Sequence, residues 1–317
     1  MLTVDRILRG IKRRITLPAN QSLLTDTDML EMCDDVIKIE ILPHIIALRQ
    51  DFLVRKIRVQ TIANQAVYDI PYRAMGMTLR DLKLSDVQGN SVRDLVIIQL
   101  ENEHEFRNGG GIPSGFYFYN DKIVLIDTPL DNLRYVEFWI EMAVSYLVLE
   151  QDCAVVQSIS NDNVTVASVP STITIGSKID FVKAKQGSSV ITFDKVVSGI
   201  SGTTISFAAG GVPNTIDVDN YGTLSIGDYI CPAEKTPVLP LPDICASFLE
   251  TTAAKRILFA IGDQESSKAM DKEVDRELDL MLKMLAPRIR GENIKIVQTQ
   301  AGLLNRPRGF RMRRGLY

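Results

Sequence analysis

The stretch from Leu239 to Tyr317 contains two helical patterns followed by a segment with too few apolar residues for a core of its own. In each pattern, apolar residues recur near one face of a helix. They are Ile244, Phe248, Ile257, Leu258 and Ile261 in the first pattern, and Met270, Val274, Leu278, Met281 and Leu285 in the second. Asp243 is placed to cap the first helix, and Gly262 to end it. We therefore expect a helical hairpin, Asp243–Ile261 and Asp263–Leu285.

The residues after the hairpin, 291–317, are expected to form an extended arm. Six basic residues and one acid lie between Glu292 and Arg314, and five and one between Asp5 and Arg14, although the net charge is −3. Such asymmetry is typical of interaction arms. The arm suits a protein groove, a sheet edge or nucleic-acid phosphates, and its near-alternate apolar residues favour the protein partner. The predicted partner-binding residues are Arg306, Arg308, Phe310, Arg311, Arg313, Arg314 and Tyr317.

The N-terminal part is expected to begin with helices and then change to strands. Residues 3–14 form an amphipathic pattern whose basic face we expect to be solvated. Potential N-caps from Thr25 onward precede a long helical run, Met29–Leu53, in which Pro43 predicts a kink. From Lys56 to Val148, short alternating runs and turn signals predict strands. Because no connection is long enough for a crossover helix, we expect these strands to be antiparallel.

The segment from Gln151 to Lys235 is rich in Val, Ile, Thr, Ser and Gly and predicts a small β-barrel or sandwich. The expected strands are Ala154–Ile159, Asn163–Ala167, Lys178–Val182, Ile191–Val197, Thr204–Phe207 and Tyr229–Pro232. Because strands precede this segment and the hairpin follows it, we interpret it as an insertion in one body. The predicted class is α+β, with N-terminal helices and an antiparallel β-region (1–149), the inserted β-domain (150–236), the helical hairpin (237–290) and the arm (291–317).

Composition predicts a soluble protein made in the cytoplasm. The 317 residues, 45% apolar and 24% charged, can bury a sizeable core. The N-terminus lacks a signal-peptide pattern, and no stretch approaches the roughly 20 apolar residues that a membrane span needs. The four cysteines are far apart without C-x-x-C spacing, so we expect buried, reduced thiols and neither a zinc site nor a redox pair. They are Cys33, Cys153, Cys231 and Cys245.

No pattern predicts a catalytic site. The acidic cluster around His104 resembles a metal-ligand set, but it lacks H-E-x-x-H spacing, and alternate residues of a strand face opposite ways. We therefore expect a solvated acidic edge; its members are Glu101, Glu103, His104 and Glu105. The glycines 109–111 lack the Lys-Ser/Thr of a phosphate-binding loop and are expected to form a turn. We predict no enzymatic activity, no cofactor and no metal.

One passage resembles a known family. IGDYICPAEKTPV, from Ile226 to Val238, is followed by LPLPD, a helix containing Ala253-Ala254-Lys255-Arg256, a Gly-Asp break and a long charged helix. This passage is similar to the head-to-tail adaptor (connector) proteins of tailed bacteriophages. The resemblance extends to motifs from Ile226 to about Leu285 and to the order of parts over most of the chain.

The resemblance implies a virion structural protein that forms a ring, usually of twelve copies, under the portal at the neck between head and tail. It implies helices in the ring wall, an arm (291–317) that inserts against the portal, tail or nozzle proteins on the other face, and genomic DNA passing through the channel. Three alternatives remain open. One is a baseplate or fibre-attachment protein whose β insertion binds a tail partner or glycan. The others are a wall hydrolase built on the β-domain and a nucleic-acid binder that uses the basic ends.

Overall fold

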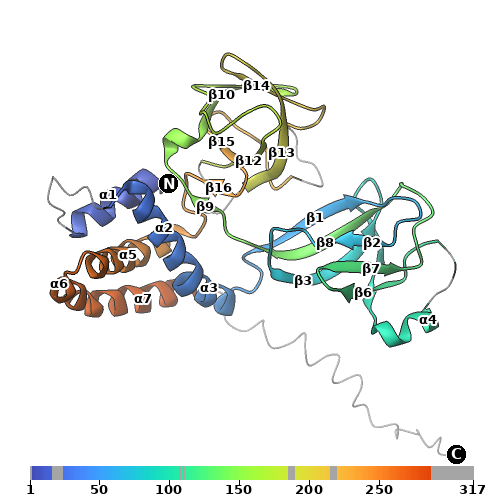
Figure 1. The fold of residues 1–317 in the computed structure, drawn as a ribbon, viewed down its shortest axis with the longest axis horizontal. Helices are drawn as coiled ribbons and strands as arrows, with labels where there is room; N and C mark the ends of the chain where they lie inside the picture. Colours follow the sequence, from blue (N-terminus) through green and yellow to red (C-terminus); the bar gives the residue numbers. More distant parts are fainter. Residues whose placement is uncertain are drawn as a thin grey trace, which may run out of the picture.

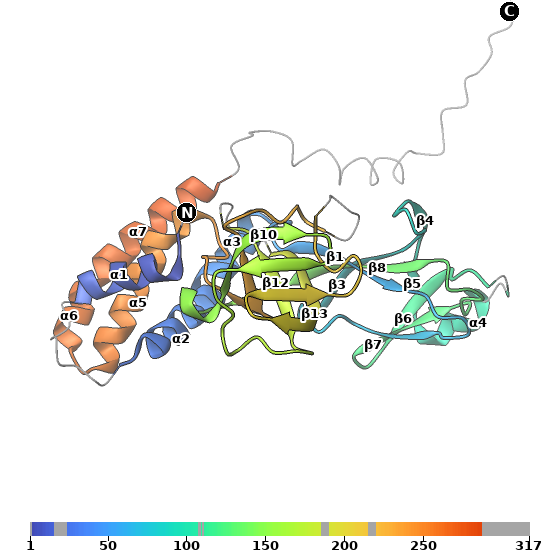
Figure 2. The ribbon, with the colours of Figure 1, turned by 90° about the horizontal axis from the view of Figure 1, so that it is seen from above.

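The computed structural model describes residues 2–15, 24–106, 109, 111–184, 190–214 and 220–286. It is a mixed α+β protein, as the sequence predicts, and contains a helical body, a β-region of two sheets and a barrel. The helical body and the β-region lie at opposite ends, with the barrel beside the segment that joins them (Figure 1). Figure 2 shows the same order along the long axis from above.

The helical body is built from the two ends of the described chain. Its helices are α1 (Val4–Ile15), α2 (Asp26–Val36), α3 (Leu42–Leu48), α5 (Ala246–Ala260), α6 (Gln264–Ala269) and α7 (Asp271–Leu285). The apolar side of α1 packs against α5, and Leu249, Ala253 and Ala254 of α5 are fully buried. The alanines let neighbouring helices approach α5 closely, so the core of this body forms around α5.

Pro43 lies in the predicted long helix, and the helix changes its geometry there. A π-turn, η1 (Ile37–Ile41), joins α2 to α3, and the Leu42 N–H donates to the Ile37 carbonyl, five residues back. Proline has no N–H for the usual ladder and crowds the preceding turn, which favours the wider turn. At the start of α2, Thr25 and Asp28 form a reciprocal capping box. The helical run ends at Leu48, five residues before the predicted end.

The helical hairpin differs in detail from the prediction. Asp243 does not cap α5; it begins a 3₁₀ turn, Asp243–Cys245, and α5 starts at Ala246. The predicted second helix is divided into α6 and α7 at Met270. Gly262 does end the first helix, with a φ of +89° that favours glycine.

The β-region consists of two sheets with the strand orders β1-β8-β3-β4 and β2-β7-β6-β5. Their inner faces share one apolar core that includes Phe116, Ile123 and Phe138. The strands are β1 (Val54–Gln60), β2 (Val67–Asp69), β3 (Ala74–Ser85), β4 (Ser91–Asp94), β5 (Val96–Ile97), β6 (Gly115–Tyr119), β7 (Lys122–Ile126) and β8 (Tyr135–Met142).

The expectation that every pairing in the first half of the chain is antiparallel is wrong. β5 pairs parallel with β6. A 3₁₀ turn, Leu100–Asn102, and the short helix α4 (Glu103–Phe106) lie in the connection between them, in a region for which the sequence predicts strands. The last strand material of this region is also not part of the sheet, because β9 (Tyr146–Leu147) lies beyond β8 and pairs parallel with β16 (Lys235–Thr236).

The barrel closes in the strand order β10-β11-β14-β13-β12-β15 around an apolar interior that includes Phe181 and Ile230. All six strands expected between residues 154 and 232 are present. They are β10 (Ala154–Ser160), β11 (Asn163–Val166), β12 (Lys178–Val182), β13 (Val190–Ser201), β14 (Thr204–Phe207) and β15 (Tyr229–Pro232). Because β10 pairs with β15, the start and the end of the barrel segment are neighbours.

Candidate functional site

The predicted partner-binding residues lie outside the described residues, which end at Ala286. They are Arg306, Arg308, Phe310, Arg311, Arg313, Arg314 and Tyr317. The described part of the chain nevertheless contains three features that bear on function. These are a buried charge cluster at the base of the barrel, a basic face on α1, and an apolar surface at the far end of the β-region.

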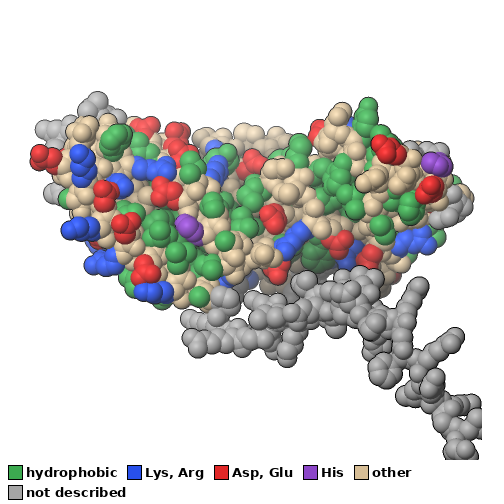
Figure 3. Space-filling view, turned by 90° about the horizontal axis from the view of Figure 1, so that it is seen from below, with side chains coloured by type: hydrophobic (Ala, Val, Ile, Leu, Met, Phe, Trp, Pro, Cys, Tyr) green, Lys and Arg blue, Asp and Glu red, His purple; other side chains and the backbone are tan. Residues whose placement is uncertain are grey.

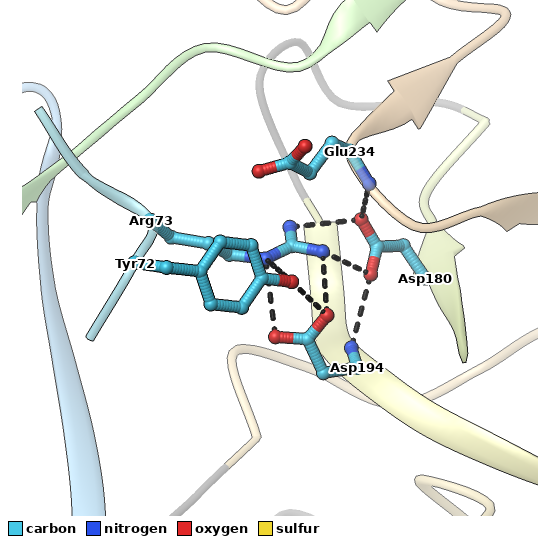
Figure 4. Close-up of polar contacts among 5 residues, drawn as sticks. All are labelled: Tyr72, Arg73, Asp180, Asp194 and Glu234. Atoms are coloured by element: carbon cyan, nitrogen blue, oxygen red, sulfur yellow. Dashed lines mark hydrogen bonds and ion pairs between the residues drawn. The ribbon is translucent and has the colours of Figure 1, made fainter. Parts of the chain in front are cut away.

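The buried charge cluster joins the β-region to the barrel (Figure 4). We call it the Arg73 cluster; its members are Tyr72, Arg73, Asp180, Asp194 and Glu234. Arg73 lies just before β3 and is only 3% exposed, and Asp180 of β12 is fully buried. The two terminal nitrogens of Arg73 donate to the two carboxylate oxygens of Asp180, each at 2.9 Å. Arg73 therefore binds the barrel through a bidentate ion pair, the strongest geometry that Arg offers.

Asp194 of β13 completes the cluster from a second barrel strand. Its carboxylate accepts from Nη2 of Arg73 at 2.9 Å and from Nε at 3.2 Å, and the Tyr72 hydroxyl donates to it as well. Asp194 has a φ of +57°, in the left-handed region. Its own N–H donates to Asp180 at 3.0 Å, so the unusual backbone conformation gives this residue both an N–H and a carboxylate for the cluster.

The electrostatics of the cluster favour the charged form of Arg73 and, on balance, oppose that of Asp180. Burial raises the pKa of the Asp180 carboxyl, whereas the Arg73 guanidinium and the N–H groups of Asp194 and Glu234 oppose that rise. Burial lowers the pKa of Arg73, but the charge of Asp180 and the hydrogen bonds to Asp180, Tyr72 and Asp194 together more than offset this effect, so the net shift is upward. With every Asp180 oxygen bonded, removing Arg73 would leave an uncompensated charge in a buried site.

The chain segment that connects the β-region to the barrel is anchored to the helical body by a second buried carboxylate. Asp34 of α2 accepts from the Leu147 N–H at 3.0 Å, and Lys38, one turn later, lies 3.3 Å from the centre of the Tyr146 ring. Burial raises the pKa of Asp34 to about 7, although the Leu147 N–H and Lys38 act in the opposite direction. Asp34 thus holds β9 in place against α2. The chain leaves the barrel through β16, which pairs with β9.

Helix α1 carries the basic face that the sequence predicts. Arg6, Arg9 and Arg13 are exposed, and they line a hollow together with Gly10, Arg14 and Glu250. Arg14 is paired with Glu250 of α5. A Cβ at Gly10 would lie 2.3 Å from the Glu250 carboxylate, so glycine is what allows α5 to bring this acid against α1. The outer arginines form a cationic surface of the kind that contacts anions.

The apolar surface lies at the end of the β-region farthest from the helices. Figure 3 shows hydrophobic side chains among charged ones over this end. Large exposed side chains there come from the parallel pair β5–β6, from α4 and from the connecting turns; they include Val96 at 58%, Ile97 at 60%, Leu100 at 56%, Phe106 at 41% and Phe118 at 43%. This end of the β-region therefore exposes more large apolar side chains than a solvated surface requires.

The residues that we examined as metal ligands do not form a site in the described chain. Glu101 and His104 are exposed on separate short helices, η2 and α4. Among the described residues, no three His, Cys, Asp or Glu side chains are grouped to hold a metal ion. At the predicted glycine turn, the Gly109 N–H donates to the Asp127 carboxylate at 3.0 Å. A carboxylate in that position opposes phosphate binding.

Sequence patterns did not reveal the Arg73 cluster, because its partners lie 107 and 121 residues away in the chain. No local motif surrounds Arg73, and only the pairing of barrel and β-region brings the charges together. None of the helices in the described ranges is long and apolar enough to cross a membrane. A scan against protein-family models and a search of curated proteins found no match to this chain.

Proposed function

We propose that this protein is a virion structural protein, a head-to-tail adaptor that forms a ring under the portal and connects the capsid to the tail. The observation that carries the proposal is the role of residues 226–285 in the fold. They form the last barrel strand, the return strand β16 and the helices α5 to α7. The passage that resembles the adaptor family therefore forms one continuous unit that links the barrel to the core of the helical body.

Ring formation requires each protomer to present two complementary faces to its neighbours, since a head-to-tail contact closes only as a ring or continues as a filament. We assign the ring wall to the helical body, whose outer helix α7 carries a mixed row of charges and leaves Leu280 and Met284 about half exposed. The apolar end of the β-region, at the opposite end of the molecule, is the surface that we assign to tail or nozzle proteins. DNA passes through the channel without sequence-specific contacts.

The arm, residues 291–317, is the part that we assign to the portal. It follows α7, the last helix among the described residues, in the sequence, and its arginines and aromatic residues supply the anchor types that dominate protein interfaces. In this function the protein acts by geometry and insertion, so we assign it no catalytic step.

The experiment is to mix the full chain with purified portal rings and measure the mass of the complex by native mass spectrometry. The test variant ends at Arg290. A matched variant keeps the arm and replaces Arg306, Arg308, Arg311, Arg313 and Arg314 with glutamine, which separates charge from chain length. We expect full-length protein to saturate the ring, the truncated chain to lose binding, and the glutamine variant to bind weakly with little dependence on salt.

The same unfolding temperature for all three proteins would show that the body is intact in each. Undiminished assembly of the truncated chain would refute the role of the arm. Absence of any complex between the full chain and portal rings would refute the adaptor function, and binding of the full chain to glycans instead would replace it with the fibre-attachment hypothesis.

A further inference from the structure

Two of the buried cysteines face each other at the base of the barrel. Strands β10 and β15 pair antiparallel with Ala154 opposite Ile230, so the next pair along is Cys153 and Cys231. Their neighbours Ala154 and Ile230 point into the barrel, whereas both cysteines belong to the apolar cluster outside it. Cys153 is 3% exposed and Cys231 is fully buried.

The backbone hydrogen bonds show whether Cys153 and Cys231 occupy a hydrogen-bonded or a non-hydrogen-bonded position of the ladder. The Val156 N–H donates to the Asp228 carbonyl, and hydrogen-bonded pairs alternate along an antiparallel ladder, which makes Ala154 and Ile230 the next such pair. The Cys153 N–H donates to the Glu150 carbonyl and not to β15. Cys153 and Cys231 therefore occupy a non-hydrogen-bonded position, where Cα atoms approach to about 4.5 Å. Disulfides accept Cα separations of about 4.4–6.8 Å.

The two side chains are buried free thiols that belong to the same apolar cluster. Burial raises the pKa of the Cys231 thiol well above its usual value, and the Cys153 thiol and the nearby Asp180 carboxylate add to the rise. Because the thiolate is the reacting form, a pair in this environment reacts slowly and chiefly when the strands open locally. Burial therefore keeps both cysteines reduced, although they lie next to each other.

We propose that Cys153 and Cys231 are a disulfide-forming site that a small-molecule disulfide, such as oxidised glutathione, converts into a covalent bond across β10 and β15. One cysteine thiolate attacks a sulfur of the oxidant, whose S–S bond breaks and releases one glutathione thiolate. The second cysteine thiolate then attacks the cysteine sulfur of the mixed disulfide and expels the other glutathione. Two cysteine thiols are oxidised, one oxidised glutathione is reduced, and the two protons pass to the released glutathiones.

The position of the bond gives it a mechanical consequence. It joins the first and last strands of the barrel at the point where the chain arrives from and returns to the rest of the molecule. Asp180, the partner of Arg73, pairs with Cys231 from β12, the strand that flanks β15 on the edge away from β10. The covalent bond and the Arg73 cluster would therefore hold the same end of the barrel. The stage at which the disulfide forms rests on the proposed function, since a virion leaves a reducing cytoplasm for an oxidising medium. The capacity of the two cysteines to form the disulfide does not rest on it.

The experiment treats the full chain with oxidised glutathione at pH 8 and follows intact mass and peptide maps under non-reducing conditions. The working protein carries Cys33→Ser and Cys245→Ser, so that only the proposed pair remains. Its two matched controls carry in addition Cys153→Ser or Cys231→Ser. We expect the pair to lose the mass of two hydrogen atoms, to yield one linked peptide, and to raise the unfolding temperature of the barrel by roughly 10–20 °C.

Each single-thiol control should end either unmodified or as a glutathione adduct. Repeating the reaction in a urea concentration that populates local opening removes slow access as an explanation for no reaction. If the paired protein then accumulates two glutathione adducts, or keeps both thiols while the single-thiol controls react, the proposal is wrong. Loss of portal binding by any of these variants would bear on the proposed function and not on the disulfide.

Discussion

Removal of Arg73 tests whether the Arg73 cluster holds the barrel to the β-region. In Arg73→Met, an apolar side chain of similar length replaces the cation, and Asp180 remains buried with only its two backbone N–H donors. Breaking a buried ion pair by removing one partner costs about 3–5 kcal/mol. Because the two N–H donors still stabilise Asp180, and water can reach the partly exposed Asp194, we expect a loss near the lower end of this range, about 3 kcal/mol in the free energy of unfolding.

The assay is equilibrium unfolding in urea, followed by two local signals. Trp139 of β8 is the single tryptophan of the chain and reports on the β-region, while hydrogen exchange of β12 and β13 peptides reports on the barrel. The double variant Arg73→Met with Asp180→Asn removes both charges and keeps an acceptor for the N–H groups. It should recover part of the loss, on the order of 1–2 kcal/mol, because no unpaired buried charge remains.

The matched control is Arg80→Met. Arg80 is also paired with an aspartate, Asp51, but the Asp51 side chain is 89% exposed. Exposed pairs contribute about 0–1 kcal/mol, so this variant should unfold almost as the parent does. Equal losses for Arg73→Met and Arg80→Met would refute the argument that burial makes the Arg73 pair structurally important.

Three further predictions concern the helical body. The pKa of Asp34 is raised to about 7 in the folded state, so ionisation of Asp34 lowers the free energy of unfolding increasingly from about pH 4 to pH 7. Asp34→Asn should remove this pH dependence and stabilise the protein at pH 8 by at most about 4 kcal/mol, measured by urea titrations at several pH values. Thr25→Ala should cost about 1 kcal/mol in thermal unfolding, whereas Thr27→Ala, at an exposed site in the same turn, should cost much less. Gly10→Ala should cost about 1–3 kcal/mol, because its Cβ meets the Glu250 carboxylate, and Glu250→Ala should rescue it in the same assay.

Each of the last three predictions has an outcome that contradicts it. A parallel pH dependence for the parent and Asp34→Asn would show that another group sets the slope. Equal effects of the two threonine substitutions would exclude the capping box as the source of stability. A Gly10→Ala defect that persists in the Glu250→Ala background would mean that the helix packing, and not the carboxylate, requires glycine.

Local patterns were sufficient for most helices and strands of this chain. The period of Val4, Ile7, Leu8 and Ile11 requires one buried helix face, and the alternation in the barrel segment requires strands. Gly262 was identified as a helix end because few other residues adopt its backbone angle. Asp243 was misplaced because cap preferences act at several neighbouring positions, and here a 3₁₀ turn came first.

Pairing partners could not be read from these patterns. Strand periodicity says which side chains share a face, but it does not say which strand lies alongside, so the parallel pairs β5–β6 and β9–β16 were missed. The absence of a long crossover helix did not exclude parallel pairing. A parallel pair of only two residues on each strand forms wherever two segments run side by side in the same direction.

The sequence by itself determined which segments are helical or extended, where the acids and bases concentrate, and that its cysteines lack metal-binding spacing. The tertiary structure alone decided which distant residues meet. Contact between the barrel and the β-region places Arg73 in a buried ion pair, and closure of the barrel places Cys153 opposite Cys231. The physical reason is that local patterns report how a residue relates to its neighbours in the chain, whereas burial and charge pairing depend on contacts that chain closure creates.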